Sequence, residues 1–202
     1  MAATPRGRVG ASDRDPIEGI AFSSEERNEL PDNASEFERC RFAGLDLKGF
    51  RFAGRTFVDS TFQQCDLSLV ELNGTSFRNV RFVDCKLVGA RFDHCHAFLL
   101  SFRFERCNLE LASFHGLRVK GTHFMQCRLR EADLSSADLS HASFGECDLG
   151  GAIFEATTLE GADLRTAVNY SIDPGTNRLR KARFSRDGLS GLLDRTGIIV
   201  SD

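Results

Sequence analysis

A five-residue motif repeats almost without interruption along most of this chain. Residues 132–144 show it plainly, because a small residue, a polar residue and then Leu or Phe recur there three times in a row. Followed in steps of five, the Leu or Phe positions fall into two registers. The first contains Phe37, Phe42, Leu47, Phe52, Phe57, Phe62, Leu67, Leu72, Phe77, Phe82, Leu87, Phe92 and Ala97. The second, shifted by two residues, contains Leu99, Phe104, Leu109, Phe114, Val119, Phe124, Leu129, Leu134, Leu139, Phe144, Leu149, Phe154, Leu159 and Leu164.

A period of five fits neither an α-helix, whose faces recur every 3.6 residues, nor a β-strand, which alternates every two. Fixed self-similarity of this kind indicates a solenoid, in which each unit buries its apolar residue by stacking on the next turn. The position two before each Leu or Phe is the second one expected to point inward. It is often Ala, and all seven cysteines fall on it.

The repeat resembles the pentapeptide-repeat family, whose formula is A(D/N)LXX. The triplets that match the formula directly begin at Ala132, Ala137, Cys147 and Ala162. The resemblance covers roughly residues 35–166. It implies an all-β fold, a right-handed quadrilateral β-helix with four units per turn.

The rest of the chain divides around this repeat. We expect residues 1–16 to be a flexible leader and residues 17–34 to be an N-terminal cap with a short helix around 25–29. We expect residues 35–166 to form the β-helix and residues 167–202 to form a C-terminal segment for capping or dimerisation. A cap is expected because an uncovered coil would expose apolar interior and unpaired strand edges.

No feature of the sequence indicates catalysis or a cofactor. There is no phosphate-binding glycine loop, no nucleophile with a base at a recognisable spacing, and no carboxylate pair outside the repeat formula. Leu and Phe fill the inward positions, so we expect a packed interior without a ligand cavity. We therefore expect a protein that is not an enzyme.

The cysteines and histidines raise the question of a metal. Cys107, Cys127 and Cys147, spaced by 20 residues, are predicted to stack, either as a metal site or as small buried filler, and we favour filler. His94 and His96 flank Cys95, but the repeat places Cys95 inward and both histidines outward, so we expect no metal there. Seven thiols without a paired framework, no apolar run long enough for a membrane and no secretory signal favour a cytoplasmic protein.

Two irregularities interrupt the repeat. Two extra residues within 94–102 separate the registers, and we expect them to form a surface bulge or small loop. Arg55 occupies a position that is otherwise small. It is consistent either with a bulge or with an arginine that leaves the interior at a corner.

Residues 131–164 contain eight acidic residues and no Lys or Arg, although the whole chain has a net charge of only −3. The acids are Glu131, Asp133, Asp138, Glu146, Asp148, Glu155, Glu160 and Asp163. One interpretation is a solvated face, since Asp before Leu belongs to the repeat formula. The other is a surface that complements the basic, nucleic-acid-binding groove of a partner protein. The same charge argues against direct binding of nucleic acid.

Beyond Leu164 the pattern ends. The sequence predicts a short helix over 188–195 with Asp187 as its cap and Gly197 as its stop, followed by a strand over 198–200. This apolar tail is too short to fold alone. It either caps its own coil or joins a second copy of the chain, and we favour the homodimer.

The tail also resembles one branch of the family, the topoisomerase-protecting proteins: Qnr, MfpA, and the microcin B17 and albicidin immunity proteins. The matching residues are Asp173, Pro174, Asn177, Arg178, Gly188, Leu189, Leu193, Arg195, Gly197, Ile198, Ile199 and Val200. This resemblance implies a non-enzymatic DNA mimic that binds DNA gyrase or topoisomerase IV and protects it from a poison. It places the dimer interface at Leu189, Leu192, Leu193, Ile198 and Val200, beside the acidic residues.

Two features depart from that branch. The long loops of Qnr proteins are absent, and Arg78, Arg81, Arg91, Arg103 and Arg106 occupy outward positions in the middle turns. An immunity protein for a gyrase-poisoning natural product therefore fits better than a Qnr protein proper. The alternative is a scaffold repeat protein whose partner is unrelated to DNA.

Overall fold

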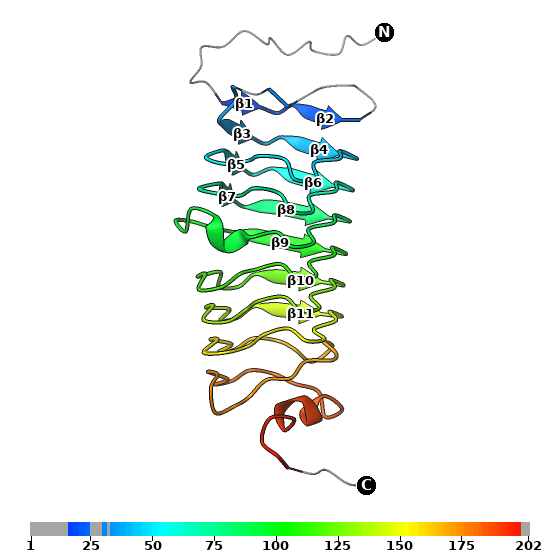
Figure 1. Cartoon of the computed structure of the whole chain (residues 1–202), viewed down its shortest axis with the longest axis vertical. Coiled ribbons are helices and arrows are strands. Elements are labelled where there is room, and N and C mark those ends of the chain that lie inside the picture. The colour runs from blue at the N-terminus through cyan, green and yellow to red at the C-terminus, as the bar shows by residue number, and fades with distance from the viewer. Residues whose placement is uncertain (1–15, 25–29, 32, 199–202) are drawn as a thin grey trace.

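The chain forms a rod of stacked turns in the computed structural model, which describes residues 16–24, 30–31 and 33–198 (Figure 1). Neighbouring turns pair in parallel at a spacing of 20 residues, so that Phe42 lies opposite Phe62 and Phe62 opposite Phe82. Four five-residue units therefore complete one turn. The predicted pentapeptide-type solenoid is confirmed.

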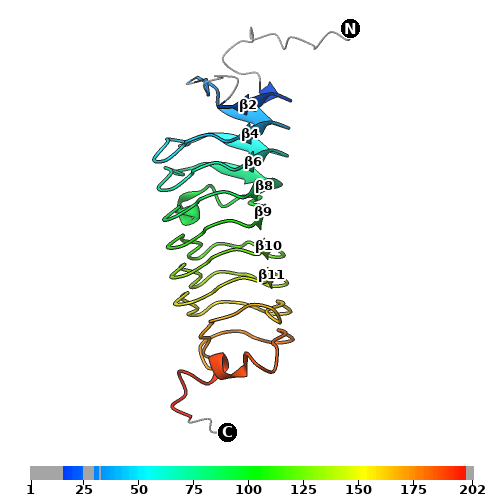
Figure 2. The same ribbon diagram turned by 90° about the vertical axis from the view of Figure 1, so that its right-hand side faces the viewer.

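Each turn crosses four faces, named here in chain order. The first face is the sheet β1 (Ile17–Glu18), β3 (Glu36–Glu38), β5 (Thr56–Val58) and β7 (Ser76–Arg78). The second is the longer sheet β2 (Ala21–Ser23), β4 (Arg41–Ala43), β6 (Thr61–Gln63), β8 (Val80–Val83), β9 (Phe102–Glu105), β10 (His123–Met125) and β11 (Ser143–Gly145). The third and fourth faces are held by isolated parallel bridges, such as Asp66 with Lys86 and Arg51 with Glu71. Figure 2 shows the strands of the second face stacked one above another along the rod.

A ladder of phenylalanines runs through the interior behind the second face. Its members are Phe22, Phe42, Phe62, Phe82, Phe104, Phe124 and Phe144. Successive rings are stacked at centroid distances of 4.4–5.3 Å with interplanar angles of 12° or less. Strands of three or four residues offer little pairing by themselves. Burial of each ring, worth about 1.5–3 kcal/mol, is what holds the turns together.

The corners between faces require a left-handed backbone. The residue two after most central Leu or Phe positions has a positive φ, whether it is glycine or not. Gly161 shows a second reason for glycine, because an added Cβ would lie 2.7 Å from Nδ1 of His141 on the turn before.

The change of register occurs where the sequence predicted it, but different residues enter the core. The chain passes through the short 3-10 helix η1 (Phe92–His94) and a loop that projects from the rod (Figure 1). Ala97 and Leu99, which the five-residue count places inside, are both exposed, Leu99 by 59%. Leu100 and Phe102 are buried instead. The two extra residues lie in this loop, and Phe104 therefore lies opposite Phe82, 22 residues earlier in the chain.

All seven cysteines are buried free thiols, as predicted. The stacked column is longer than expected, because Cys65 and Cys85 join Cys107, Cys127 and Cys147 along the third face. The Cys127 thiol donates to the Met125 carbonyl at 3.3 Å. A buried thiol that donates only a weak hydrogen bond to the backbone behaves as a small hydrophobic side chain that fills space in the core.

Arg55 neither forms a bulge nor leaves the interior: its N–H donates to the Phe52 carbonyl at 2.9 Å and its carbonyl accepts from the Ser76 N–H at 2.9 Å, which is the regular pattern of the repeat. Its guanidinium carbon lies 5.3 Å from the ring centroid of Phe50 and 5.9 Å from that of Phe37, and the residue is only 9% exposed. A cation over aromatic faces accounts for an arginine at a small-residue position.

The two ends differ from the expectations in detail. Three predictions fall largely or wholly outside the described residues: the flexible leader over 1–16, the helix around 25–29, and the strand over 198–200, which includes Val200. At the C-terminus, the expected helix over 188–195 is the single 3-10 turn η2 (Leu189–Leu192), and its N-cap is Gly188 rather than Asp187. The reason is close packing on Tyr170, since a Cβ at Gly191 would lie 2.2 Å from the Tyr170 carbonyl oxygen.

Candidate interaction surface

The eight acidic residues of segment 131–164 surround the rod instead of lining one face. The third face and its corners carry Glu131, Glu146 and Asp148, the fourth carries Asp133 and Glu155, the first carries Asp138 and Glu160, and the second carries Asp163. The solenoid brings them into about two turns of height. It does not gather them into a single patch.

The four aspartates of this set have a structural role. In each case Oδ1 accepts a hydrogen bond from the backbone N–H two residues later, at 3.0–3.2 Å. The aspartates are Asp133, Asp138, Asp148 and Asp163. This turn explains why the repeat formula has Asp or Asn before Leu, because both side chains can accept the bond.

Most of these aspartates are also paired with a cation. Asp138 lies 3.1 Å from Nζ of Lys120, Asp148 lies 3.2 Å from Nη1 of Arg130, and Asp163 lies 2.7 Å from Nη2 of Arg165. Asp133 lies 3.9 Å from His115, which neutralises it only when protonated. The sequence segment has no Lys or Arg before Arg165, but neighbouring turns and flanking residues supply cations from outside it.

The glutamates behave differently. Glu155 lies 3.9 Å from Arg195 of the C-terminal segment, and Glu146 accepts a hydrogen bond from Gln126 at 3.0 Å. Among the described residues, Glu131, Glu146 and Glu160 form no ion pair with Lys or Arg. Because their carboxylates are neither bound in turns nor neutralised, they are the acids most available to a partner.

Hydrogen bonds hold the pKa of several aspartates below the usual value. The main cause is the Asn169 amide for Asp148 and the Arg165 guanidinium for Asp163, whereas the Ser68 hydroxyl lowers the pKa of Asp66. In the unfolded chain these carboxyls bind protons more readily, at a pKa of about 3.9. Their contribution to stability is therefore complete above that value and is lost as the pH falls through the folded-state pKa values.

We expect the free energy of unfolding to be flat from about pH 8 to pH 5 and to fall steadily below about pH 4. Urea unfolding at a series of pH values measures this. Asp148→Asn keeps an acceptor for the turn and should make the acid slope shallower. An acid slope as steep as that of the wild type would show that Asp148 does not contribute to it.

The C-terminal segment packs on the end of the coil. Ile172 is buried and its N–H donates to the Gly191 carbonyl at 2.8 Å. Leu192 is half-buried against the core, and Leu193 is also half-buried. Leu189 and Ile198 remain 49% and 58% exposed. Of the five residues predicted for the dimer interface, two are thus partly covered by their own chain and two are exposed, whereas Val200 lies outside the described residues.

The outward arginines of the middle turns are partly compensated. Arg91 pairs with Asp93 at 2.7 Å, and Arg106 pairs with Asp84 and Glu105. One arrangement on the second face is not apparent from the sequence: Arg81, Arg103 and His123 form a column. Counting in steps of 20 pairs position 81 with position 101, so the inserted residues conceal it.

The described part of the chain contains neither a candidate metal site nor a membrane-spanning helix. Cys95 points inward at 7% exposure, while His94 and His96 are exposed. Over the described ranges, no group of three or more His, Cys, Asp or Glu side chains is placed to hold a metal ion. In the same ranges, no helix is long and apolar enough to cross a membrane.

Comparison with known families agrees with the fold. Residues 35–114 match the model described as a pentapeptide repeat region, and residues 132–168 match the model for pentapeptide repeats in eight copies. Together these matches cover more than half of the chain. The protein belongs to the pentapeptide-repeat family.

Solved structures with the same fold include full-length QnrB1, a plasmid-mediated fluoroquinolone resistance protein. It is 17% identical, with a TM-score of 0.60, and the match covers 91% of this chain and 100% of that one. A trypsin-treated QnrB1 variant is 22% identical, with a TM-score of 0.49 and coverage of 92% and 98%. The protein Rfr23 from the cyanobacterium Cyanothece 51142 is 14% identical, with a TM-score of 0.35 and coverage of 73% and 88%. No curated protein sequence gives a significant match.

Proposed function

We propose that this protein is a non-enzymatic DNA mimic that binds DNA gyrase or topoisomerase IV and protects the enzyme from a poison. Its biological role would then be antibiotic resistance or self-immunity. The proposal combines the sequence resemblance of the C-terminal segment to the topoisomerase-protecting branch with the charge of the last turns. QnrB1 shares the fold, and its name indicates fluoroquinolones as the first class of poison to test.

Charge spacing along the rod axis is the observation that carries the proposal. Residues 131–164 occupy somewhat less than two turns, or roughly 8 Å of height at the usual strand spacing. Four of the eight carboxylates have no Lys or Arg partner, namely Glu131, Asp133, Glu146 and Glu160. That leaves about one uncompensated charge per 2 Å, close to the value of about 1.7 Å for duplex DNA. The charges also lie on every side of the rod, as phosphates do around a duplex.

Two groups of acids allow the mechanism to be tested. Glu131→Gln, Glu146→Gln and Glu160→Gln together remove three uncompensated charges, whereas Asp138→Asn, Asp148→Asn and Asp163→Asn remove three that are already paired and keep the turn acceptors. We expect the first triple variant to bind gyrase at least tenfold more weakly and with a shallower salt dependence. The second should change the affinity less than about threefold.

The measurement is a gyrase supercoiling and cleavage assay with a fluoroquinolone, combined with direct binding. The wild type should reduce cleavage complexes at protein concentrations near that of the enzyme. A folded glutamate variant that protects as well as the wild type would exclude charge mimicry. A wild-type protein that neither binds nor protects gyrase or topoisomerase IV would favour the second candidate, a scaffold protein. The observation that favours a scaffold protein is the ion pairing of Asp138, Asp148 and Asp163, because these charges are already neutralised within the chain.

We further propose that the protein is a homodimer joined through its C-terminal segment. Leu189 and Ile198 would form the centre of the interface, because they are large apolar side chains left exposed on a segment that is otherwise docked. Leu192 and Leu193, which are half-buried, would lie between these two residues and the end of the coil. Val200 belongs to the same proposed interface by sequence alone.

Leu189→Ser together with Ile198→Ser should convert the dimer to a monomer in light scattering, without lowering the melting temperature of the coil by more than a few degrees. Exposed apolar residues at an interface contribute to association and little to the fold of one copy. The control is Leu111→Ser together with Ile153→Ser, which changes two apolar residues that are exposed along the coil. If the C-terminal variant remains a dimer, the interface lies elsewhere.

A further inference from the structure

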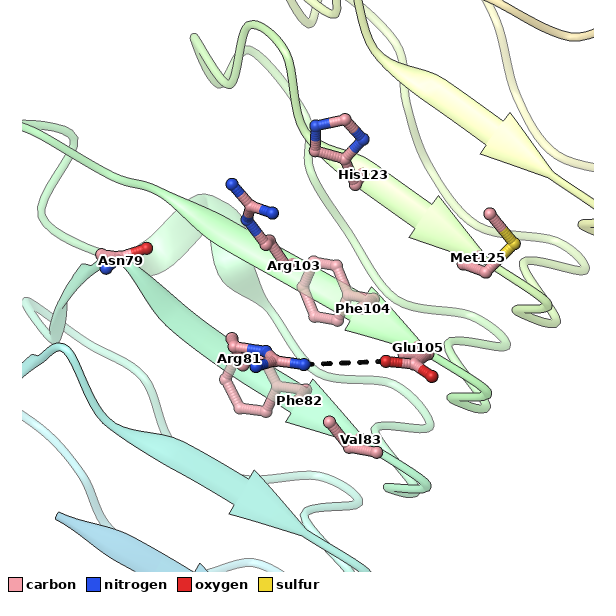
Figure 3. A pocket seen from close by; sticks show the side chains of 9 residues that line it. All are labelled: Asn79, Arg81, Phe82, Val83, Arg103, Phe104, Glu105, His123 and Met125. Carbon is pink, nitrogen blue, oxygen red and sulfur yellow. Dashed lines mark ion pairs between the residues drawn. The ribbon is translucent and has the colours of Figure 1, made fainter. Parts of the chain in front are cut away.

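Three potential cations lie on successive turns of the second face. Arg81 of β8 is directly opposite Arg103 of β9, which is directly opposite His123 of β10. Figure 3 shows the three side chains along neighbouring strands on the same surface. At a strand spacing of about 4.8 Å, the two arginines repel each other.

Elsewhere on the rod, neighbouring turns usually oppose unlike charges. Arg51 faces Glu71, Asp66 faces Lys86, Arg118 faces Asp138 and Arg128 faces Asp148. Among the described residues, two acidic pairs lie opposite each other, Glu18 with Glu38 and Asp46 with Asp66. Each has a cation nearby, since Arg39 pairs with both glutamates and Lys86 lies 3.6 Å from Asp66. The Arg81–Arg103 pair is compensated on one side only. Glu105 lies 3.8 Å from Arg81, whereas the Arg103 side chain has no ion pair or hydrogen bond with any described residue.

The column borders a hollow in the surface. Its volume is about 450 Å³, and its lining includes Arg81, Arg103, Glu105, His123 and Met125 (Figure 3). Glu105 is the acid in this lining, and Arg106 pairs with it from the adjacent corner. His123 is exposed, and its Nδ1 lies 2.9 Å from the Ser143 hydroxyl, which leaves Nε2 without a described partner. The hollow is therefore lined by two guanidiniums and an imidazole, one on each of three successive turns, and Glu105 is the negative charge among its lining residues.

We propose that this column binds a phosphate monoester or inorganic phosphate, with the anion bridging Arg81 and Arg103. A dianion with three terminal oxygens can accept from both guanidiniums and from the imidazole, and it converts the repulsion of the stacked cations into attraction. A nucleic acid fits less well, because a chain of net charge −3 repels a long polyanion. The site is distinct from the acidic turns of the proposed topoisomerase interface, so either proposal can fail without the other.

Thermal unfolding of the full chain at low ionic strength tests the site. Without added anion, Arg103→Gln should raise the melting temperature by about 1–2 °C, because it relieves repulsion. Arg91→Gln makes the same change of charge at an arginine that is paired with Asp93, and it should leave the melting temperature unchanged or lower it. Inorganic phosphate at about ten times its dissociation constant should raise the wild-type value by roughly 3–5 °C relative to chloride at equal ionic strength.

Binding of inorganic phosphate and of a short neutral peptide with and without one phosphoserine, measured by calorimetry, identifies the source of the anion. Arg103→Gln should weaken binding at least tenfold and Arg91→Gln should not. Glu105→Gln should strengthen binding about threefold, since it frees Arg81. Tighter binding of the phosphopeptide than of phosphate indicates a phosphorylated partner, and the reverse indicates the free ion. Equal behaviour of phosphate and chloride, or equal loss in Arg103→Gln and Arg91→Gln, would overturn the proposal.

Discussion

Phe144→Asp should abolish cooperative folding of the coil around β11. Phe144 is 0% exposed, and its ring stacks on Phe124 at 5.0 Å. Loss of a buried Phe side chain costs about 3–5 kcal/mol, and a carboxylate without a partner in an apolar column adds several more. The sum is comparable with the whole stability of a typical domain. Within the described residues, the buried hydrophobic side chains form one continuous cluster along the rod, so no separate core could stabilise the remaining turns by itself.

Circular dichroism and urea unfolding measure the effect. Met125→Asp is the control, because Met125 lies on the adjacent strand β10 but points outward and is 43% exposed. We expect that variant to melt within a few degrees of the wild type. A Phe144→Asp protein with an unchanged melting temperature would show that Phe144 does not face the interior.

Asn177→Ala should be the most destabilising small change at the C-terminal end, by roughly 3–5 kcal/mol. Asn177 is 7% exposed, and its side chain is the hydrogen-bond partner of three backbone groups. Its Oδ1 accepts from the Thr157 N–H at 2.9 Å, and its Nδ2 donates to the carbonyls of Phe154 and Asp173, both at 2.9 Å. Each buried backbone group left without a partner costs about 1–3 kcal/mol.

Urea unfolding together with hydrogen exchange at the Thr157 amide measures this loss. We expect exchange at Thr157 to accelerate more than exchange in β6, because the damage is local to the last turns. Asn73→Ala is the matched control, since Asn73 is exposed and makes no described side-chain hydrogen bond. Unchanged protection at Thr157 would mean that another group can replace Asn177.

The sequence showed which acidic residues belong to the candidate surface, but it did not show how they are arranged or paired. The acids of segment 131–164 were visible as a run, but their separation into turn-forming aspartates and free glutamates depends on hydrogen bonds such as that from the Gly150 N–H to Asp148. Two of their cations come from the preceding turn, namely Lys120 for Asp138 and Arg130 for Asp148. Proximity along the chain cannot show a pair that forms between turns.

The five-residue repeat alone determined that the chain is a solenoid and which side of each unit faces inward. An apolar residue every fifth position can be buried only by stacking turns, so the direction of Phe104 or Phe144 is a local property. Tertiary structure decided which residues lie opposite one another. The two residues added in the loop after Phe92 change the spacing between turns from 20 to 22, and this extends the cysteine column, aligns Arg81 with Arg103 and leaves Leu99 outside. The physical reason is that register depends on how the whole loop packs, and the sequence pattern is equally compatible with several choices of which loop residue enters the core.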